Sequence, residues 1–88
     1  MSTSWKVRIE PVVLDLLATR ARDAGRPAPG PQSRPFDEGW LDSVAYVELV
    51  EALERRLDIE VDAVEIDPEA LDTVAGLVDQ LSGAVMED

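Results

Sequence analysis

Three stretches of this chain repeat apolar residues at the spacing of an α-helix. They cover about residues 9–24, 42–57 and 72–81. In each stretch the apolar side chains recur three or four positions apart, which places them on one helix face. The stripes are Ile9, Val12, Val13, Leu16 and Leu17; Tyr46, Leu49, Val50, Leu53 and Leu57; and Val74, Leu77, Val78 and Leu81. Because each stripe must be buried against another element, the sequence predicts an all-α fold built as a small helical bundle.

Local signals predict where the first and last helices start and stop. Pro11 suits the first turn of the first helix, where its missing N–H costs nothing, and Gly25 is suited to end that helix. Asp72 or Thr73 can cap the last helix, and Gly83 can end it.

The connecting segments complete the predicted architecture. Residues 26–35 contain four prolines, which bar helix and central strand and predict a long, extended first loop. Apolar side chains at residues 36–41 then pin the end of this loop onto the core. Residues 58–71 alternate briefly between apolar and acidic, but a lone strand is unstable, so we expect a loop with one short helical turn and no paired strands. The prediction is a four-helix bundle of three main helices and one short helix: a single domain over residues 1–88, with its core at about 9–82 and flexible termini.

The charge balance excludes several functions. The chain has 8 Lys and Arg against 19 Asp and Glu, a net charge of −11, and neither Cys nor His. Nucleic acid and anionic membranes would repel it. Thiol nucleophiles, disulfides, imidazole chemistry and zinc fingers are excluded, so no metal site is predicted. No stretch reaches the roughly 18 apolar residues of a membrane span, and no signal-peptide core is present, so we expect a cytoplasmic location.

The acidity is concentrated after residue 35. Only three acidic residues, Glu10, Asp15 and Asp23, precede that point. Such a surface can serve merely to keep the protein in solution, or it can dock basic partners, and the charge pattern alone leaves both interpretations open.

The hydroxyl of Ser43 is the candidate functional group of this chain. It stands at the start of the second predicted helix, directly after the long loop, where free N–H groups and the helix dipole favour an anion. Taken alone, the pair Asp42-Ser43 is most often a helix cap.

The sequence around Ser43 resembles the prosthetic-group attachment site of acyl carrier proteins. The family pattern is Asp-Ser, an aliphatic residue, and then an amphipathic helix with Glu-Leu and a later Leu-Glu, as found at residues 42–44, 48–49 and 53–54. Residues 9–17, 57–61 and 71–74 also fit, so the resemblance covers about residues 9–82. It implies a carrier protein and not an enzyme, with 4′-phosphopantetheine on Ser43 holding an acyl or aminoacyl group as a thioester.

The resemblance also implies partners. Asp42 would orient a phosphopantetheinyl transferase, Val44 and Val47 would supply apolar contact, and Glu48, with Glu54, would meet basic side chains. From their spacing alone, Val44 and Val47 could equally be the edge of a broad core stripe. The further expected partners of a monomeric carrier are an acyl- or aminoacyl-loading enzyme and an acyltransferase or ketosynthase.

Departures from the family pattern favour a specialised pathway. They are the proline-rich loop, Ala45 and Tyr46 after the attachment motif, Glu51, and the pair Arg55-Arg56. These features predict a discrete carrier of secondary, polyketide-type metabolism. A peptidyl or aminoacyl carrier of nonribosomal peptide synthesis is the alternative. A small acidic helical adaptor without a prosthetic group is an alternative of another class.

Overall fold

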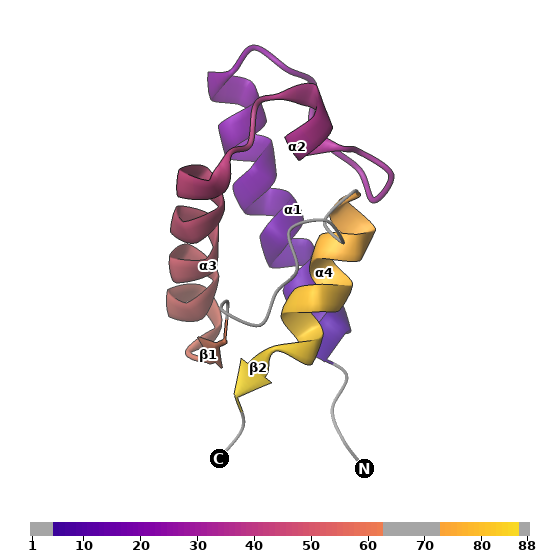
Figure 1. Cartoon of the computed structure of the whole chain (residues 1–88). Coiled ribbons are helices and arrows are strands. Elements are labelled where there is room, and N and C mark those ends of the chain that lie inside the picture. Colours follow the sequence, from indigo (N-terminus) through magenta and orange to yellow (C-terminus); the bar gives the residue numbers. More distant parts are fainter. Residues whose placement is uncertain (1–4, 63–72, 87–88) are drawn as a thin grey trace.

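The computed structural model describes residues 5–62 and 73–86 (Figure 1). In this part of the chain the order is α1 (Trp5–Asp23), α2 (Pro35–Glu38), α3 (Ser43–Leu57), β1 (Glu60–Val61), α4 (Val74–Gly83) and β2 (Val85–Met86). The three long helices and the long first loop confirm the predicted helical bundle. The short helix of this part of the chain is α2, at residues for which the sequence predicted only apolar anchoring of the loop. In the described part, no helix is both long and apolar enough to cross a membrane.

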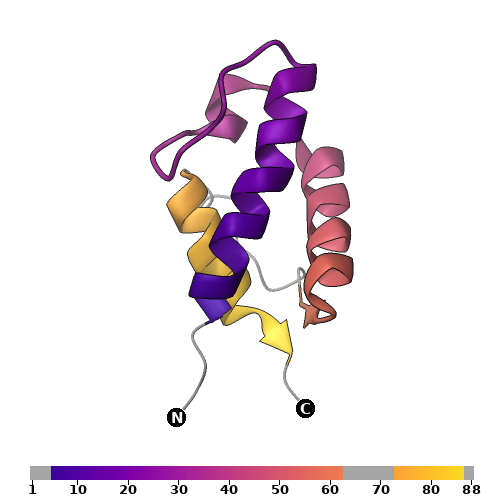
Figure 2. The same ribbon diagram turned by 180° about the vertical axis from the view of Figure 1, so that it is seen from behind.

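Helix α1 is the element that the others share. It packs against both α3 and α4, and α3 and α4 both run back toward the end of the bundle where α1 begins (Figures 1 and 2). From Ile9 to Ala21, every fourth residue of α1 is fully buried, and the apolar residues at the neighbouring positions are partly buried, which gives the one-sided face of an amphipathic helix. The buried core consists of Ile9, Val13, Leu17, Leu41, Ala45, Tyr46, Leu49, Val50, Leu53, Val61, Val74, Leu77, Val78 and Leu81.

The first helix begins four residues earlier than the sequence predicts. Trp5 packs against the core, and the guanidinium of Arg8 lies 4.8 Å from the centre of its ring. Pro11 therefore lies inside α1 and not in its first turn, so that prediction was wrong. The missing proline N–H leaves the carbonyl of Val7 without its helical donor. Both residues are exposed, so water can reach that carbonyl.

The proline-rich loop is held at both ends by hydrogen bonds. Where it leaves α1, Arg26 N–H donates to Ala21 O at 2.7 Å. Gly39 ends α2 with φ 83°, a left-handed conformation that glycine adopts without steric cost. Carbonyls in the loop then accept bonds from the first turn of α4: Val74 N–H donates to Ser33 O and Ala75 N–H to Pro31 O, both at 2.9 Å. Leu41 is buried, and Phe36 and Trp40 pack against the core, as predicted.

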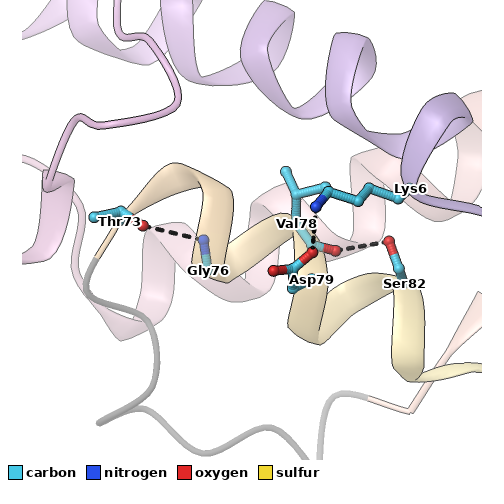
Figure 3. A network of polar contacts seen from close by, with 6 residues as sticks. All are labelled: Lys6, Thr73, Gly76, Val78, Asp79 and Ser82. Atoms are coloured by element: carbon cyan, nitrogen blue, oxygen red, sulfur yellow. Dashed lines mark hydrogen bonds and ion pairs between the residues drawn. The ribbon is translucent and has the colours of Figure 1, made fainter.

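A cap and an ion pair fix α4 (Figure 3). Thr73 Oγ1 accepts a 3.1 Å hydrogen bond from the N–H of Gly76, so Thr73 is the N-cap that the sequence suggested. On the next turns, Lys6 of α1 reaches Asp79 at 2.8 Å, and this contact raises the pKa of Lys6. The helix continues to Gly83, and Ala84 is its C-cap.

The prediction of no paired strands was wrong. β1 and β2 form an antiparallel pair with Glu60 opposite Met86 and Val61 opposite Val85. The missing partner is supplied by the chain after α4, which the bundle brings beside the end of α3. The short helical turn expected within residues 58–71 falls largely outside the described residues.

The buried hydroxyl of Tyr46 should make the free energy of unfolding depend on pH in the alkaline range. Its ring packs against Phe36, with centroids 6.0 Å apart, and its buried hydroxyl has no hydrogen-bond partner in the described structure. Burial raises the pKa of Tyr46 from 10.0 to about 12. From pH 10 to about 12, the unfolded chain loses a proton that the folded chain keeps, so the free energy of unfolding falls as pH rises.

Phenolate absorbance measures this titration directly, because Tyr46 is the chain's single tyrosine. The control Tyr46→Phe should lose this contribution to the pH dependence of urea unfolding. At neutral pH it should be at least as stable as the parent chain, since it removes an unpaired buried hydroxyl. A folded-state titration at the ordinary tyrosine value would contradict the prediction.

Candidate functional site

The site is built on the first turn of α3. Asp42 is the N-cap, with extended backbone angles, and its Oδ1 accepts a 2.8 Å hydrogen bond from the N–H of Ala45. Its backbone carbonyl accepts the first helical bond, from Tyr46 N–H at 2.8 Å. Asp42 therefore orients the turn that carries Ser43.

Ser43 is the first residue of α3, and it is exposed. In the part of the chain that the structure describes, no hydrogen bond or ion pair engages its side chain. The first-turn amides and the helix dipole favour a negative charge at this position. A phosphodiester on this hydroxyl would point into solvent and displace no core side chain, so the site fits a phosphate-linked group.

Val44 and Val47 lie on the solvent side of the same turn. Their exposed fractions are 67% and 51%, whereas Ala45 and Tyr46 between them are buried. The interpretation of these valines as the edge of the core stripe is therefore wrong. The first two turns of α3 present one hydroxyl and two apolar side chains together.

Two predicted docking acids have contacts within the chain. Glu48 forms an ion pair with Arg20 of α1, at 2.6 Å between Oε2 and Nη2. Glu54 accepts a 2.9 Å hydrogen bond from the N–H of Val61 and so holds β1 against α3. No local pattern predicts the contact between Glu48 and Arg20, because the two residues lie 28 positions apart in the chain.

A groove runs beside the Arg20–Glu48 pair, between α1 and the outer side of α3. Its volume is about 350 Å³. Charged side chains from both helices contribute much of its lining, so it does not form an apolar enclosure. The lining residues are Leu16, Thr19, Arg20, Asp23, Glu48, Leu49, Ala52 and Arg55.

An exposed serine on a helix N-terminus beside an apolar patch, in a small helical bundle, is the arrangement of a carrier domain. Residues 12–81 match the family described as the phosphopantetheine attachment site. The chain therefore belongs to this family: it is a carrier protein that bears covalent 4′-phosphopantetheine, and it is the substrate of a phosphopantetheinyl transferase and not an enzyme.

Two curated relatives share the name D-alanyl carrier protein. The protein from Bacillus subtilis (strain 168) is 41% identical over 70 residues, which cover 80% of this chain and 88% of the relative. The protein from Bacillus pumilus (strain SAFR-032) is 42% identical over 52 residues, which cover 59% of this chain and 67% of the relative.

Two replacements of Asp42 separate its helix-capping hydrogen bond from its negative charge. Asp42→Ala should lower the free energy of unfolding by about 1 kcal/mol, because the Ala45 N–H loses its acceptor. Asp42→Asn should keep most of the stability while removing the charge, since asparagine caps as well as aspartate. Urea unfolding measures both, with exposed Glu51→Ala as a control expected to change stability by less than about 0.5 kcal/mol. Equal stability of the alanine and asparagine variants would argue against the cap.

Proposed function

We propose that Ser43 bears the phosphopantetheine arm and that the chain carries an aminoacyl group as a thioester, with D-alanine as the first candidate. The observation that carries the attachment site is the exposed, unengaged hydroxyl of Ser43 on the α3 N-terminus. The arm supplies the terminal thiol that this cysteine-free chain lacks.

The other serine within the family match is a poor acceptor. Residues 12–81 contain only Ser33 and Ser43. Ser33 Oγ accepts a 2.9 Å hydrogen bond from the N–H of Gly30, and its carbonyl holds Val74 of α4. Modification of Ser33 would disturb the contact between the loop and α4, whereas modification of Ser43 disturbs no contact that the structure describes.

The attachment step needs little from this chain beyond position. The Ser43 oxygen forms a bond to the β-phosphorus of coenzyme A, the pyrophosphate bond breaks, and adenosine 3′,5′-bisphosphate leaves. The neighbouring carboxylate of Asp42 is engaged as the helix cap, where it accepts the N–H of Ala45. We propose that the transferase supplies the base for the hydroxyl proton and that the carrier supplies an oriented, exposed hydroxyl.

Ser43→Ala should abolish arm attachment by a broad-specificity phosphopantetheinyl transferase with coenzyme A, while leaving the circular dichroism of the fold unchanged. Intact-mass spectrometry detects the added phosphopantetheine. Ser33→Ala is the matched control and should still be modified in full. Attachment to the Ser43→Ala protein, or none to the parent chain, would overturn the proposed site.

Val44 and Val47 are proposed as the apolar contact for visiting enzymes, beside Asp42. The support is their exposure next to Ser43, since exposed apolar side chains gathered at one place mark interaction surfaces.

Val44→Asp should raise the KM of the transferase by about tenfold, the equivalent of about 1.4 kcal/mol, without unfolding the protein. The matched control is Val7→Asp, because Val7 is 74% exposed in the first turns of α1. Helix α1 begins at the end of the bundle opposite the start of α3 (Figure 1). The two variants have the same charge change. Equal kinetics for both would show that the position of Val44 has no special role.

The aminoacyl cargo rests on the relatives, both of which carry D-alanyl in their names. The polyketide-type interpretation, with its acyltransferase and ketosynthase, receives no support from the comparisons.

Loading the holo-protein tests the cargo. With ATP, D-alanine and an adenylating enzyme that serves a D-alanyl carrier protein, the intact mass should rise by one alanyl group, and hydroxylamine should release it, as expected of a thioester. L-alanine with the same enzyme is the control for stereochemical choice. Failure to load D-alanine, together with transfer of malonyl groups by a malonyl-transferring enzyme, would favour the polyketide-type alternative.

A further inference from the structure

The acid best placed beside the apolar contact is already paired within the chain. Glu48 follows Val47 directly and lies one turn beyond Val44 on α3. Its Oε2 is 2.6 Å from Nη2 of Arg20, which reaches it from the last turn of α1. The side chains of Arg20 and Glu48 are 38% and 59% exposed, so both remain within reach of a visiting protein.

Glu51 stands one turn further along α3 in a different electrostatic setting. It is exposed, and the structure of residues 5–62 and 73–86 gives it no ion pair or hydrogen bond. The remaining acid of α3, Glu54, accepts the N–H of Val61. Arg55 and Arg56 lie in the last turn of α3, and Arg56 pairs with Asp15 of α1. Of the three acids of α3, Glu51 therefore has no partner within the described structure.

We propose that Arg20 is a specificity-determining residue that withholds Glu48 from basic partners and leaves Glu51 as the free anionic contact of the docking surface. This inference rests on the proposed function of the α3 surface. A cationic side chain of a visiting enzyme that contacts Glu48 must displace the guanidinium of Arg20. It then gains only the difference between two similar ion pairs, whereas contact with Glu51 displaces only water.

Releasing Glu48 should have only a small effect on partner binding, because the Arg20–Glu48 ion pair is exposed to solvent. Exposed ion pairs are weak, so release of Glu48 should strengthen encounter by about two- to fivefold and no more. The effect should shrink as salt is added, because charges near the surface are screened over about 10 Å at 0.1 M ionic strength.

The chain offers a matched control for Arg20. Arg22 lies in the same last turn of α1, is exposed, and has no ion pair in the described structure. Arg20→Gln and Arg22→Gln therefore make the same change in net charge, but only the first frees Glu48.

The experiment measures the KM and kcat of a broad-specificity phosphopantetheinyl transferase with each carrier at low salt. Arg20→Gln should lower KM by about threefold with kcat unchanged. Arg22→Gln should have a much smaller effect, which reports net charge alone. In the Glu48→Gln background, Arg20→Gln should have no more effect than Arg22→Gln, because the residue through which Arg20 acts is absent. In the parent chain, Glu51→Gln should raise KM more than Glu48→Gln.

A second measurement does not depend on any partner. Urea unfolding is measured for the parent, for Arg20→Gln, for Glu48→Gln and for the double variant. The free energies of unfolding should show coupling between Arg20 and Glu48. No coupling would mean that Arg20 does not hold Glu48 in solution, which overturns the inference.

The outcomes separate this inference from the function on which it rests. Normal modification at Ser43 with equal KM for Arg20→Gln and Arg22→Gln overturns the role of Arg20 alone. A change in kcat with unchanged KM also overturns it, because Arg20 would then act on the chemical step and not on docking. No modification of the parent chain removes the proposed function itself, and the inference with it.

Discussion

The structure depends on burial of the apolar stripe of α1 against two helices at once. Ile9, Val13, Leu17 and Ala21 are completely buried. A domain of this length buries only a modest core. Because α1 packs against both α3 and α4, the apolar faces of all three helices are buried in one core. With α1 in the centre, one side of α3 must face inward, and its other side is left for solvent.

That division of α3 produces the site. Its inward residues belong to the core, while Ser43, Val44 and Val47 face outward from the first two turns. The cap from Asp42 fixes where the helix begins, and so fixes which residue occupies the first position with its hydroxyl in solvent. A carrier needs no catalytic cleft, because the reactive thiol is on the attached arm and the enzymes that the carrier visits perform the chemistry.

The net charge of −11 gives an incomplete picture of the docking surface. Such a charge favours encounter with basic enzymes in general. Close to the attachment site, however, α1 contributes Arg20 to the surface of α3, and the first 35 residues hold most of the cations of the chain. The packing of α1 against α3 therefore places a cation of one helix beside an acid of the other, which affects the acids that a partner can use.

The sequence by itself determined the helical stripes, the long proline-rich loop, the N-caps of α3 and α4, and the place of Asp42-Ser43 at a helix start. These features depend on neighbours within about one helical turn. It could not determine whether Val44 and Val47 were core or surface, because the width of a buried face depends on which helices cover it. It also missed the start of α1 at Trp5 and the pairing of β1 with β2. Only the tertiary structure decided these features and the pairing of Arg20 with Glu48. Each depends on contacts between segments far apart in the chain, and no local spacing encodes such contacts.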